Sequence, residues 1–544
     1  MKNYLEEILY DVLEHFNLDK EHFPAIKIEK PRDPSHGDAA TNVALLLAKP
    51  LRKNPRQIAE QIVSHLDYSA DIIQSAEIAG PGFINFRYAD KYLFNELEKI
   101  IKLKEEYGKS DVNSGKKILV EFVSANPTGP LTVGHGRNAV LGDTISRLFE
   151  YTGAHVDREY YFNNAGRQMR VLGESVKIRY LQLLGHEIEF PDGHYEGEYI
   201  TDIAKQLYND FGDNLAGKKD ELIFKEKAES VIFADIQNTL KRLNISMDSF
   251  FNEHELYEDG SIEDVIDKLR EKELAYDKEG ATWFKTTQFG KDKDTVLVKS
   301  TGEPTYRLPD IAYHLNKLDR GYDLCIDLFG ADHIDTYPDV LNGVKALGYD
   351  AGKIDVLIYQ FVTIVKDGKP YKMSTRKANF VTLDDLMDEV GADVTRFFFL
   401  MRAPSTHLEF DIAQAKEAGE KNPVFYLQYA HARIKSILRK VEELNIETES
   451  ASLELLKHES ELRLIKDLLQ FTEVIESAAQ SREPHRVINF LELLATDFTT
   501  FYHDCRIIGV ETPLTRARAV LAAATAQTLA NGLQVLGIEA PDRM

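Results

Sequence analysis

The residues with the clearest chemical potential follow a short apolar run at residues 118–123. The loop after this run contains Asn126-Pro127-Thr128-Gly129-Pro130 and closes on Thr132, Gly134 and His135. Its prolines remove backbone donors and Gly129 permits positive φ, so a strand must end there. A helical pattern begins near Gly134, and the free N–H groups of a helix start favour anions. The spacing predicts a phosphate-binding corner, to which His135 can donate a hydrogen bond, with an ordinary strand–loop–helix corner as the alternative.

Two acidic side chains stand where a cation could bind. Glu121 lies inside the apolar run, where an unpaired carboxylate is costly. Asp310 follows Pro309, a residue suited to the first turn of a helix, and Tyr306 stands just before that turn. A partly buried carboxylate suits a guanidinium group, because the planar fork pairs with two oxygens. The alternative for Asp310 is an acid that only stabilises the start of its own helix.

Two weaker signals lie further along the chain. After an apolar run at residues 324–329, Gly330 opens space for a ligand and Asp332, followed by His333, can accept from ribose hydroxyls. A basic loop contains Lys372, Met373, Ser374, Thr375, Arg376 and Lys377. Such a loop can contact phosphates, but basic loops are commonly just solvated. Neither signal is specific by itself.

The composition restricts the class of protein. The 544 residues suffice for three or four domains, and 43% of them are hydrophobic. No run of 18 apolar residues occurs, and the acidic, amphipathic first 16 residues predict a domain helix, so we expect neither a membrane span nor a signal peptide. Two distant cysteines, Cys325 and Cys505, fit a reducing cytoplasm. The net charge of −23 argues against a nucleic-acid partner unless a local basic patch supplies the contacts.

The order of predicted elements indicates three parts. Residues 1–110 are predicted to form an α+β domain. Alternating strands and helices at residues 111–420 predict an α/β, doubly wound parallel nucleotide-binding (Rossmann-like) core, with ligands at the carboxyl ends of the strands. A charged stretch at about 170–290 is predicted to be a helical insertion. Residues 421–544 are predicted to form an all-α bundle, with helices from Asn422 and at about 453–480, 484–507 and 513–536.

Residues 124–135, SANPTGPLTVGH, resemble the HIGH signature of class I aminoacyl-tRNA synthetases, in the extended form found in arginyl-tRNA synthetases. Residues 372–378, KMSTRKA, resemble the KMSKS loop of the same family. Thr132 replaces the family's first histidine, and Thr375 replaces its second lysine, so Arg376 or Lys377 must carry that charge. The lysine with which some arginyl enzymes compensate is also missing, because Gly129 stands there.

The resemblance extends over the whole chain. Residues 36–49 with 79–87 resemble the family's N-terminal tRNA-binding domain, and residues 162–168 its second active-site loop. Residues 391–412 resemble its stem-contact segment, and NPVFYLQYAHAR, FYHDCR and APDRM its anticodon-binding domain. The resemblance implies a ligase that joins arginine to ATP, releases pyrophosphate, and passes arginine to the terminal adenosine of tRNA(Arg). Most members of the family activate arginine only with tRNA bound.

The resemblance also implies roles for particular residues. The catalytic donors would be Thr132, His135, Lys372, Arg376 and Lys377. ATP would contact Pro127, Thr128, Gly129, Gly134, His135, Gly330, Asp332, His333, Met373 and Ser374. Arginine would contact Glu121, Ser124, Asn126, Tyr306 and Asp310. Mg²⁺ would accompany ATP without a dedicated protein metal site, and we expect a cytoplasmic monomer that does not associate with membranes.

Two other functions remain open from the sequence. Thr132 and Thr375 motivate one alternative, a paralogue that binds tRNA or arginine but has lost catalysis. A synthetase for a different amino acid is disfavoured by Tyr306, Asp310 and Glu121.

Overall fold

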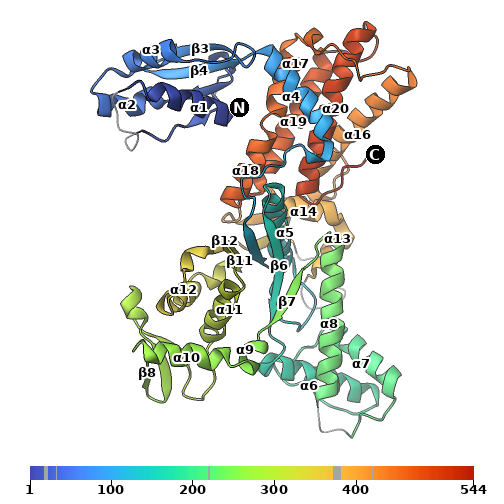
Figure 1. Cartoon of the computed structure of the whole chain (residues 1–544). Coiled ribbons are helices and arrows are strands. Elements are labelled where there is room, and N and C mark those ends of the chain that lie inside the picture. The colour runs from blue at the N-terminus through green and yellow to red at the C-terminus, as the bar shows by residue number, and fades with distance from the viewer. Residues whose placement is uncertain (17–22, 32, 218–220, 372–380, 420) are drawn as a thin grey trace.

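The structure is a computed structural model that describes residues 1–16, 23–31, 33–217, 221–371, 381–419 and 421–544. Figure 1 shows a small N-terminal sheet beside a long helical bundle, and a central parallel sheet that joins the bundle at one end. Two lobes extend from the other side of the central sheet. The predicted fold class is confirmed: an α/β core lies between an N-terminal α+β part and a C-terminal helical bundle.

The N-terminal part is an antiparallel sheet packed against helices. Its strands, in the spatial order β1-β2-β4-β3, are β1 (Ile28–Glu29), β2 (Ala39–Thr41), β4 (Phe83–Tyr88) and β3 (Ile73–Ala79). The helices are α1 (Lys2–Leu13), α2 (Val43–Leu51) and α3 (Pro55–His65). The next helix, α4 (Asp90–Leu103), leaves this part and lies among the helices of the bundle (Figure 1). The Tyr107 hydroxyl just beyond α4 donates to the Leu468 carbonyl at 2.7 Å, which fixes α4 to the bundle.

The central sheet is wholly parallel and doubly wound. Its spatial order is β12-β11-β5-β6-β7, from β12 (Ile354–Tyr359), β11 (Leu324–Gly330), β5 (Lys117–Glu121), β6 (His155–Phe162) and β7 (Ser249–Asn252). The crossing helices are α5 (Val133–Tyr151), α11 (Arg307–Asp319) and α12 (Tyr337–Ala346). The order of the strands reverses between β5 and β11, and ligands bind at such a switch point. The loop predicted to hold phosphate and the segment after β11 therefore share one edge of the sheet.

The insertion is less purely helical than predicted. Its helices are α6 (Gly166–Leu183), α7 (Glu198–Phe211), α8 (Leu222–Arg242), α9 (Glu255–Glu258) and α10 (Ser261–Glu271). The same range also contributes β7 to the central sheet, and a separate antiparallel sheet contains β8 (Ala275–Lys278), β9 (Ala281–Phe284) and β10 (Thr295–Val298). β7 was missed because its four residues are all partly buried and show no alternation; its pairing with β6 makes it a strand.

The C-terminal third begins with a connecting segment. Strands β13 (Val362–Lys366), β14 (Lys369–Pro370) and β15 (Leu408–Asp411) flank helices α13 (Leu383–Val390) and α14 (Ala392–Leu400), and α15 (Ile412–Ala415) follows. The bundle contains α16 (Pro423–Glu443), α17 (Glu459–Leu468), α18 (Phe471–Ser481), α19 (His485–Asp504) and α20 (Thr512–Val535). The single helix predicted at 453–480 is two helices, because the chain breaks between Leu468 and Phe471.

One buried arginine ties the core to the bundle. Arg396 of α14 donates to the carbonyls of Leu536 at 2.8 Å and Leu243 at 2.6 Å, and to the Asp143 carboxylate at 2.6 Å. These partners belong to the end of the bundle, the insertion and α5. A charged, hydrogen-bonded centre therefore joins the α/β core to the bundle.

Candidate active site

The predicted phosphate-binding corner is formed by the start of α5. The Thr132 N–H donates to His135 Nδ1 at 3.1 Å, and the Thr132 hydroxyl accepts from the His135 N–H at 3.5 Å, so the two residues cap the helix reciprocally. Because Nδ1 is an acceptor here, the ring proton resides on Nε2. Burial lowers the pKa of His135, which keeps the ring neutral. His135 therefore presents a neutral N–H donor at a helix N-terminus.

The proline–glycine loop is held by the insertion. The Tyr199 hydroxyl of α7 donates to the Thr128 carbonyl at 2.9 Å. A Cβ atom at Gly129 would lie 3.0 Å from the same hydroxyl, so a glycine is favoured at this close approach. Pro127 is buried next to them. No motif in the sequence pointed to Tyr199, because it lies 71 residues from Thr128 within a stretch without recognisable chemistry.

The segment that follows the basic loop, at Thr382 and Leu383, reaches the same corner. The Leu383 N–H donates to the Leu131 carbonyl at 2.8 Å, and Thr132 forms an isolated β-bridge with Thr382. The predicted phosphate-binding residues Lys372, Met373, Ser374, Arg376 and Lys377 lie outside the described residues. Only the attachment of the segment that follows them is therefore established, and it lies beside Thr132.

The other side of the site is an acidic face of α11. Asp310, at the first turn of α11, forms no hydrogen bond or salt bridge through its carboxylate within the described part of the chain. Burial, with the neighbouring charges of Glu121 and Glu253, raises the pKa of Asp310 to about 7. A buried carboxylate without a cation is unfavourable. The Asp310 carboxylate could therefore bind a cationic ligand.

Glu253 is an acidic residue that the sequence reasoning missed. It follows the unpredicted strand β7, and its carboxylate accepts from the Tyr161 hydroxyl and from Asn163 Nδ2, both at 2.7 Å. Burial raises the pKa of Glu253 as well. Since Glu253 and Asp310 influence each other electrostatically, they form one anionic patch. Only the identification of β7 would have pointed to Glu253.

Glu121 has an internal partner, contrary to what an isolated buried carboxylate would suggest. Its Oε2 atom accepts from Lys317 Nζ at 2.5 Å, and its Oε1 atom accepts from the Ser124 hydroxyl at 2.8 Å. The Ser124 hydroxyl in turn accepts from the Tyr161 N–H at 3.2 Å. Glu121 and Ser124 therefore lie together at the end of β5, beside a lysine of α11.

The remaining predicted residues lie around this centre. Asn126 is exposed, and its side chain bonds to the Asn163 N–H at 3.0 Å and to Gln168 at 2.9 Å. Tyr306 is 84% exposed, so the structure does not bring its side chain into the buried group around Asp310. Asp332 and His333 are exposed just past β11, and the His333 ring stacks on Phe329 at 5.3 Å.

Two of the predicted glycines differ in their surroundings. A Cβ atom at Gly330 would lie 2.5 Å from Asp332 Oδ1, so a larger residue there would displace the exposed Asp332 side chain. A Cβ atom at Gly134 would meet only the Thr132 hydroxyl, at an ordinary 3.6 Å. Gly134 is therefore not required by the packing of the described residues.

The backbone after β5 is strained. Val123 and Ser124 have φ of +67° and +45°, and the Ser124 N–H donates to the Phe122 carbonyl at 3.0 Å in a three-residue turn. A β-branched residue rarely adopts such a φ, and strained backbone persists only where its surroundings hold it. The predicted strand therefore ends at Glu121, earlier than the apolar run.

Asn138 of α5 is the group that holds this turn. Its Oδ1 atom accepts from the Val123 N–H at 2.6 Å, and its Nδ2 atom donates to the Leu328 carbonyl of β11 at 2.9 Å. We expect Asn138→Ala to reduce the free energy of unfolding by roughly 2–6 kcal/mol, since two buried backbone groups lose their partner at about 1–3 kcal/mol each. Urea unfolding followed by circular dichroism measures this. Asn95→Ala, on the exposed face of α4, is the control and should change stability by less than about 0.5 kcal/mol.

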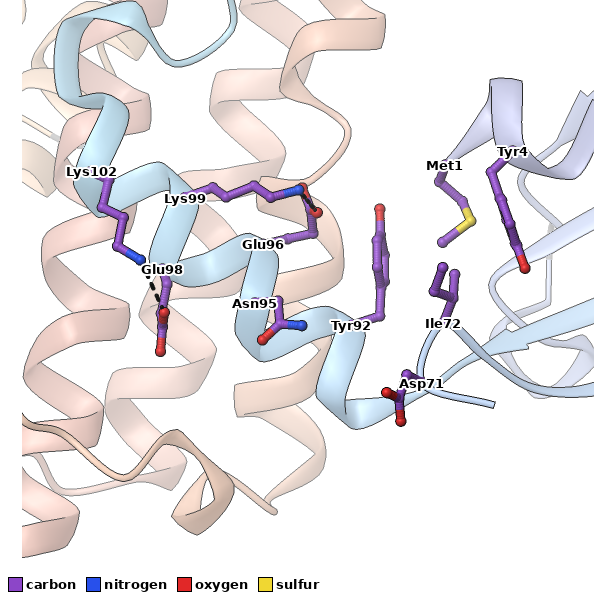
Figure 2. A pocket seen from close by; sticks show the side chains of 10 residues that line it. All are labelled: Met1, Tyr4, Asp71, Ile72, Tyr92, Asn95, Glu96, Glu98, Lys99 and Lys102. Carbon is purple, nitrogen blue, oxygen red and sulfur yellow. Dashed lines mark hydrogen bonds and ion pairs between the residues drawn. The ribbon is translucent and has the colours of Figure 1, made fainter. Parts of the chain in front are cut away.

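A separate groove lies between the N-terminal part and α4, away from these residues (Figure 2). It has a volume of about 520 Å³ and is lined by residues such as Tyr4, Tyr92, Lys99 and Lys102. Its lysines are paired with acids, Lys99 with Glu96 and Lys102 with Glu98, as Figure 2 shows. The groove therefore offers no free cation to a phosphate from these two lysines.

The described residues provide neither a cluster of metal-binding side chains nor a membrane-spanning helix. Among them, no group of three or more histidine, cysteine or acidic side chains could hold a metal ion. None of their helices is both long and apolar enough to cross a membrane.

Descriptions of known protein families match three successive segments of the chain. The family description "Arginyl tRNA synthetase N terminal domain" matches residues 2–88, "tRNA synthetases class I (R), catalytic domain" matches residues 96–398, and "DALR anticodon binding domain" matches residues 427–544. The arginine–tRNA ligases of Salinibacter ruber and Pelodictyon phaeoclathratiforme are 52% and 50% identical to the chain, and the matches cover 100% of each protein. The solved arginyl-tRNA synthetase of Thermus thermophilus shares the fold, with a TM-score of 0.78, 22% identity and 100% coverage of both chains. The chain belongs to the arginyl-tRNA synthetase family.

Proposed function

We propose that the acidic face of α11 and the corner before α5 together activate arginine with ATP, and that the chain then transfers arginine to tRNA(Arg). The observation that carries this proposal is the state of the Asp310 carboxylate. Its pKa is raised, it forms no ion pair among the described residues, and the Glu253 carboxylate lies near it. A guanidinium would supply the missing charge and could pair with carboxylate oxygens through its planar fork. This function is also that of the arginine–tRNA ligases to which the chain is similar over its whole length.

The first step needs no protein nucleophile. The carboxylate of arginine attacks the α-phosphate of ATP, a bond to phosphorus forms, and pyrophosphate leaves. The protein must position the reactants and stabilise the charge on phosphate oxygens. The Nε2–H group of His135 and the free N–H groups at the start of α5 would stabilise the charge on the phosphate oxygens. Lys372, with Arg376 or Lys377, is proposed to do so from the basic loop, and Mg²⁺ would arrive with ATP as part of the substrate.

The proposed arginine contacts separate into two groups. Asp310, with Glu253, would receive the guanidinium group. Glu121, Ser124 and Asn126 would contact the rest of the amino acid at the end of β5. Tyr306 is proposed to close over arginine by rotating its exposed side chain toward α11. The proposed ATP contacts remain Pro127, Thr128, Gly129, Gly134, Gly330, Asp332, His333, Met373 and Ser374.

The other parts of the chain are proposed to bind tRNA. We assign residues 1–110 to a tRNA-binding domain, residues 111–420 to the catalytic domain with its insertion at about 170–290, and residues 421–544 to an anticodon-binding domain. The proposal includes a monomer that works in the cytoplasm, where the two buried, unpaired cysteines stay reduced. Light scattering on the purified chain tests the oligomeric state.

The test of the function is arginine-dependent exchange of pyrophosphate into ATP, with and without tRNA(Arg). We expect exchange with arginine when tRNA is present, and none with lysine or citrulline, which lack the guanidinium. The paralogue that has lost catalysis receives no support from the comparisons, because the full-length relatives are ligases. A pure, folded chain that shows no exchange in the presence of tRNA would contradict the proposal.

The pH dependence of arginine use follows from Asp310. A guanidinium binds the ionised carboxylate, and the pKa of Asp310 in the free protein is raised to about 7. The neutral acid predominates below that pH, so kcat/KM for arginine should rise with pH and level off above about 7, with a slope approaching tenfold per pH unit on the acid side. Aminoacylation at saturating ATP and tRNA measures this. In Asp310→Asn the inflection should disappear; a wild-type profile that is flat between pH 5.5 and 8 would exclude the assignment.

A further inference from the structure

Three adjacent strands of the central sheet carry buried carboxylates side by side. Glu121 of β5 is in register with Asp327 of β11 on one side and with Glu159 of β6 on the other. Residues in register on parallel neighbours point to the same face, and neighbouring strands lie about 4.8 Å apart. Such a row of carboxylates repels itself unless cations are placed against it.

Helix α11 supplies those cations. Lys317 donates to Glu121 Oε2 at 2.5 Å and to Asp327 Oδ1 at 2.6 Å, and its ammonium lies 4.2 Å from the centre of the Tyr313 ring. Lys317 and Asp327 are 0% exposed and Glu121 is 4% exposed. One turn later, Arg320 pairs with both oxygens of Glu159, at 2.6 and 2.7 Å.

The ammonium of Lys317 has no capacity left for a ligand. It is enclosed by two carboxylates and an aromatic ring, so it does not contact a substrate directly. His314 occupies the other oxygen of Asp327, at 2.8 Å, and its second ring nitrogen lies 2.6 Å from the Asp310 carbonyl. Glu121 thus depends on Lys317 alone for a cation at bonding distance among the described residues.

We propose that Lys317 is a positioning residue for arginine: its buried ammonium fixes Glu121 as an ionised carboxylate at the end of β5, next to the cation-free Asp310. The proposal rests on the proposed function, because it assumes that arginine binds at this edge of the sheet. It goes beyond that function because Lys317 touches neither substrate. Lys317 sets the charge of a group that does.

The titratable groups around Glu121 support the inference that its charge depends on Lys317. They are Lys317, His314, Asp310 and Tyr313 of α11, Asp327 of β11 and Tyr161 of β6. Burial raises the pKa of Glu121 even with Lys317 present, and Asp327 raises it further. The Lys317 ammonium opposes this rise, so its removal would raise the pKa of Glu121 further and favour the protonated, neutral form. Arginine would then meet a neutral group where the wild type presents a charge.

The test compares Lys317→Met with the wild type, using calorimetry for arginine binding and aminoacylation for kcat and KM. We expect the Kd and KM for arginine to rise about tenfold or more near pH 7, because arginine would lose a charged contact, with the KM for ATP changed less than about twofold. The defect should shrink as the pH is raised, because Glu121 ionises again. A defect that arises only from disturbed packing would persist at high pH.

Arg320→Gln is the matched control. It breaks an ion pair on the same helix, between a partly exposed arginine and a buried carboxylate, but the pair involves Glu159 and not Glu121. We expect its pH profile for arginine to keep the wild-type shape. If Lys317→Met does not fold, Lys317→Met combined with Asp327→Asn removes one cation and one carboxylate together and still leaves Glu121 without its ammonium. This double variant should show the same pH-dependent defect.

The outcomes separate the inference from the function on which it rests. Folded Lys317 variants with a wild-type Kd and pH profile would overturn the role of Lys317, and so would an Arg320→Gln profile that matches theirs. A wild-type chain that binds arginine but does not charge tRNA would contradict the proposed function, while the binding comparison still decides the inference. If the wild type does not bind arginine with tRNA present, both proposals fall.

Discussion

Asp310→Asn is expected to lower kcat/KM for arginine by between about 30-fold and 4,000-fold while the chain stays folded. The range corresponds to the roughly 2–5 kcal/mol that a buried, hydrogen-bonded charge pair loses when one partner is truncated. The change is nearly isosteric, so it removes charge and not volume. Steady-state aminoacylation with varied arginine measures it, at a pH above 7 where the wild-type carboxylate is ionised.

The same substitution should not destabilise the protein. Asp310 has no partner that would be left unsatisfied within the described residues, and a buried carboxylate without a cation is itself unfavourable. We therefore expect the midpoint of urea unfolding to stay the same or rise. This separates a binding defect from a folding defect, which a loss of activity alone does not do.

Glu303→Gln is the matched control for Asp310→Asn. Glu303 precedes α11 in the chain; its side chain is exposed and, among the described residues, pairs only with Lys299, at 3.6 Å. Removal of this surface charge should change kcat/KM for arginine less than about twofold. Asp310→Asn with an unchanged KM for arginine would show that the guanidinium binds elsewhere.

His135→Ala is expected to lower the rate of arginine activation by roughly 10²-fold or more. The neutral Nε2–H of His135 is a donor held at the N-terminus of α5 by the bond from the Thr132 N–H to Nδ1. Donors fixed toward developing charge on phosphate oxygens contribute effects of this size. Pyrophosphate exchange in the presence of tRNA measures the rate. If the donor acts in the transition state, kcat should fall while the KM for ATP changes little.

Two further variants make the His135 result specific. His135→Gln keeps an N–H donor near the position of Nε2, so it should recover part of the lost rate. His155→Ala makes the same change on an exposed histidine at the start of β6, on the opposite edge of the sheet, and should leave the rate unchanged. Near-normal exchange by His135→Ala would refute the role of the ring.

Much of the site could be predicted because the signals are local. The loop at Asn126–Pro130 ends a strand and precedes a helix through the chemistry of proline and glycine alone, and α5 begins at Val133 as that chemistry requires. Pro309 likewise places Asp310 in the first turn of α11. The alternation of strands and helices then predicts the parallel sheet, which the structure confirms.

The rest depended on which segments become neighbours. Glu121 was predicted from its cost as a lone buried carboxylate, but its cation is Lys317, 196 residues away. Glu253 was missed because β7 has only four residues and no periodicity, and Tyr306 was expected in the pocket but is 84% exposed. The contact residues of the basic loop lie outside the described residues, so their roles stay predictions.

The sequence by itself determined the family, the parallel core, the corner before α5 and the placement of Asp310 on a helix start. Turn chemistry, helix capping and hydrophobic periodicity act over a few residues, so a single chain reveals them. Only the tertiary structure decided that Lys317 neutralises Glu121 and Asp327 while Asp310 keeps no cation. The physical reason is that the balance of buried charge depends on the lateral order of strands and on the helix that covers them, and neither is encoded within any one segment.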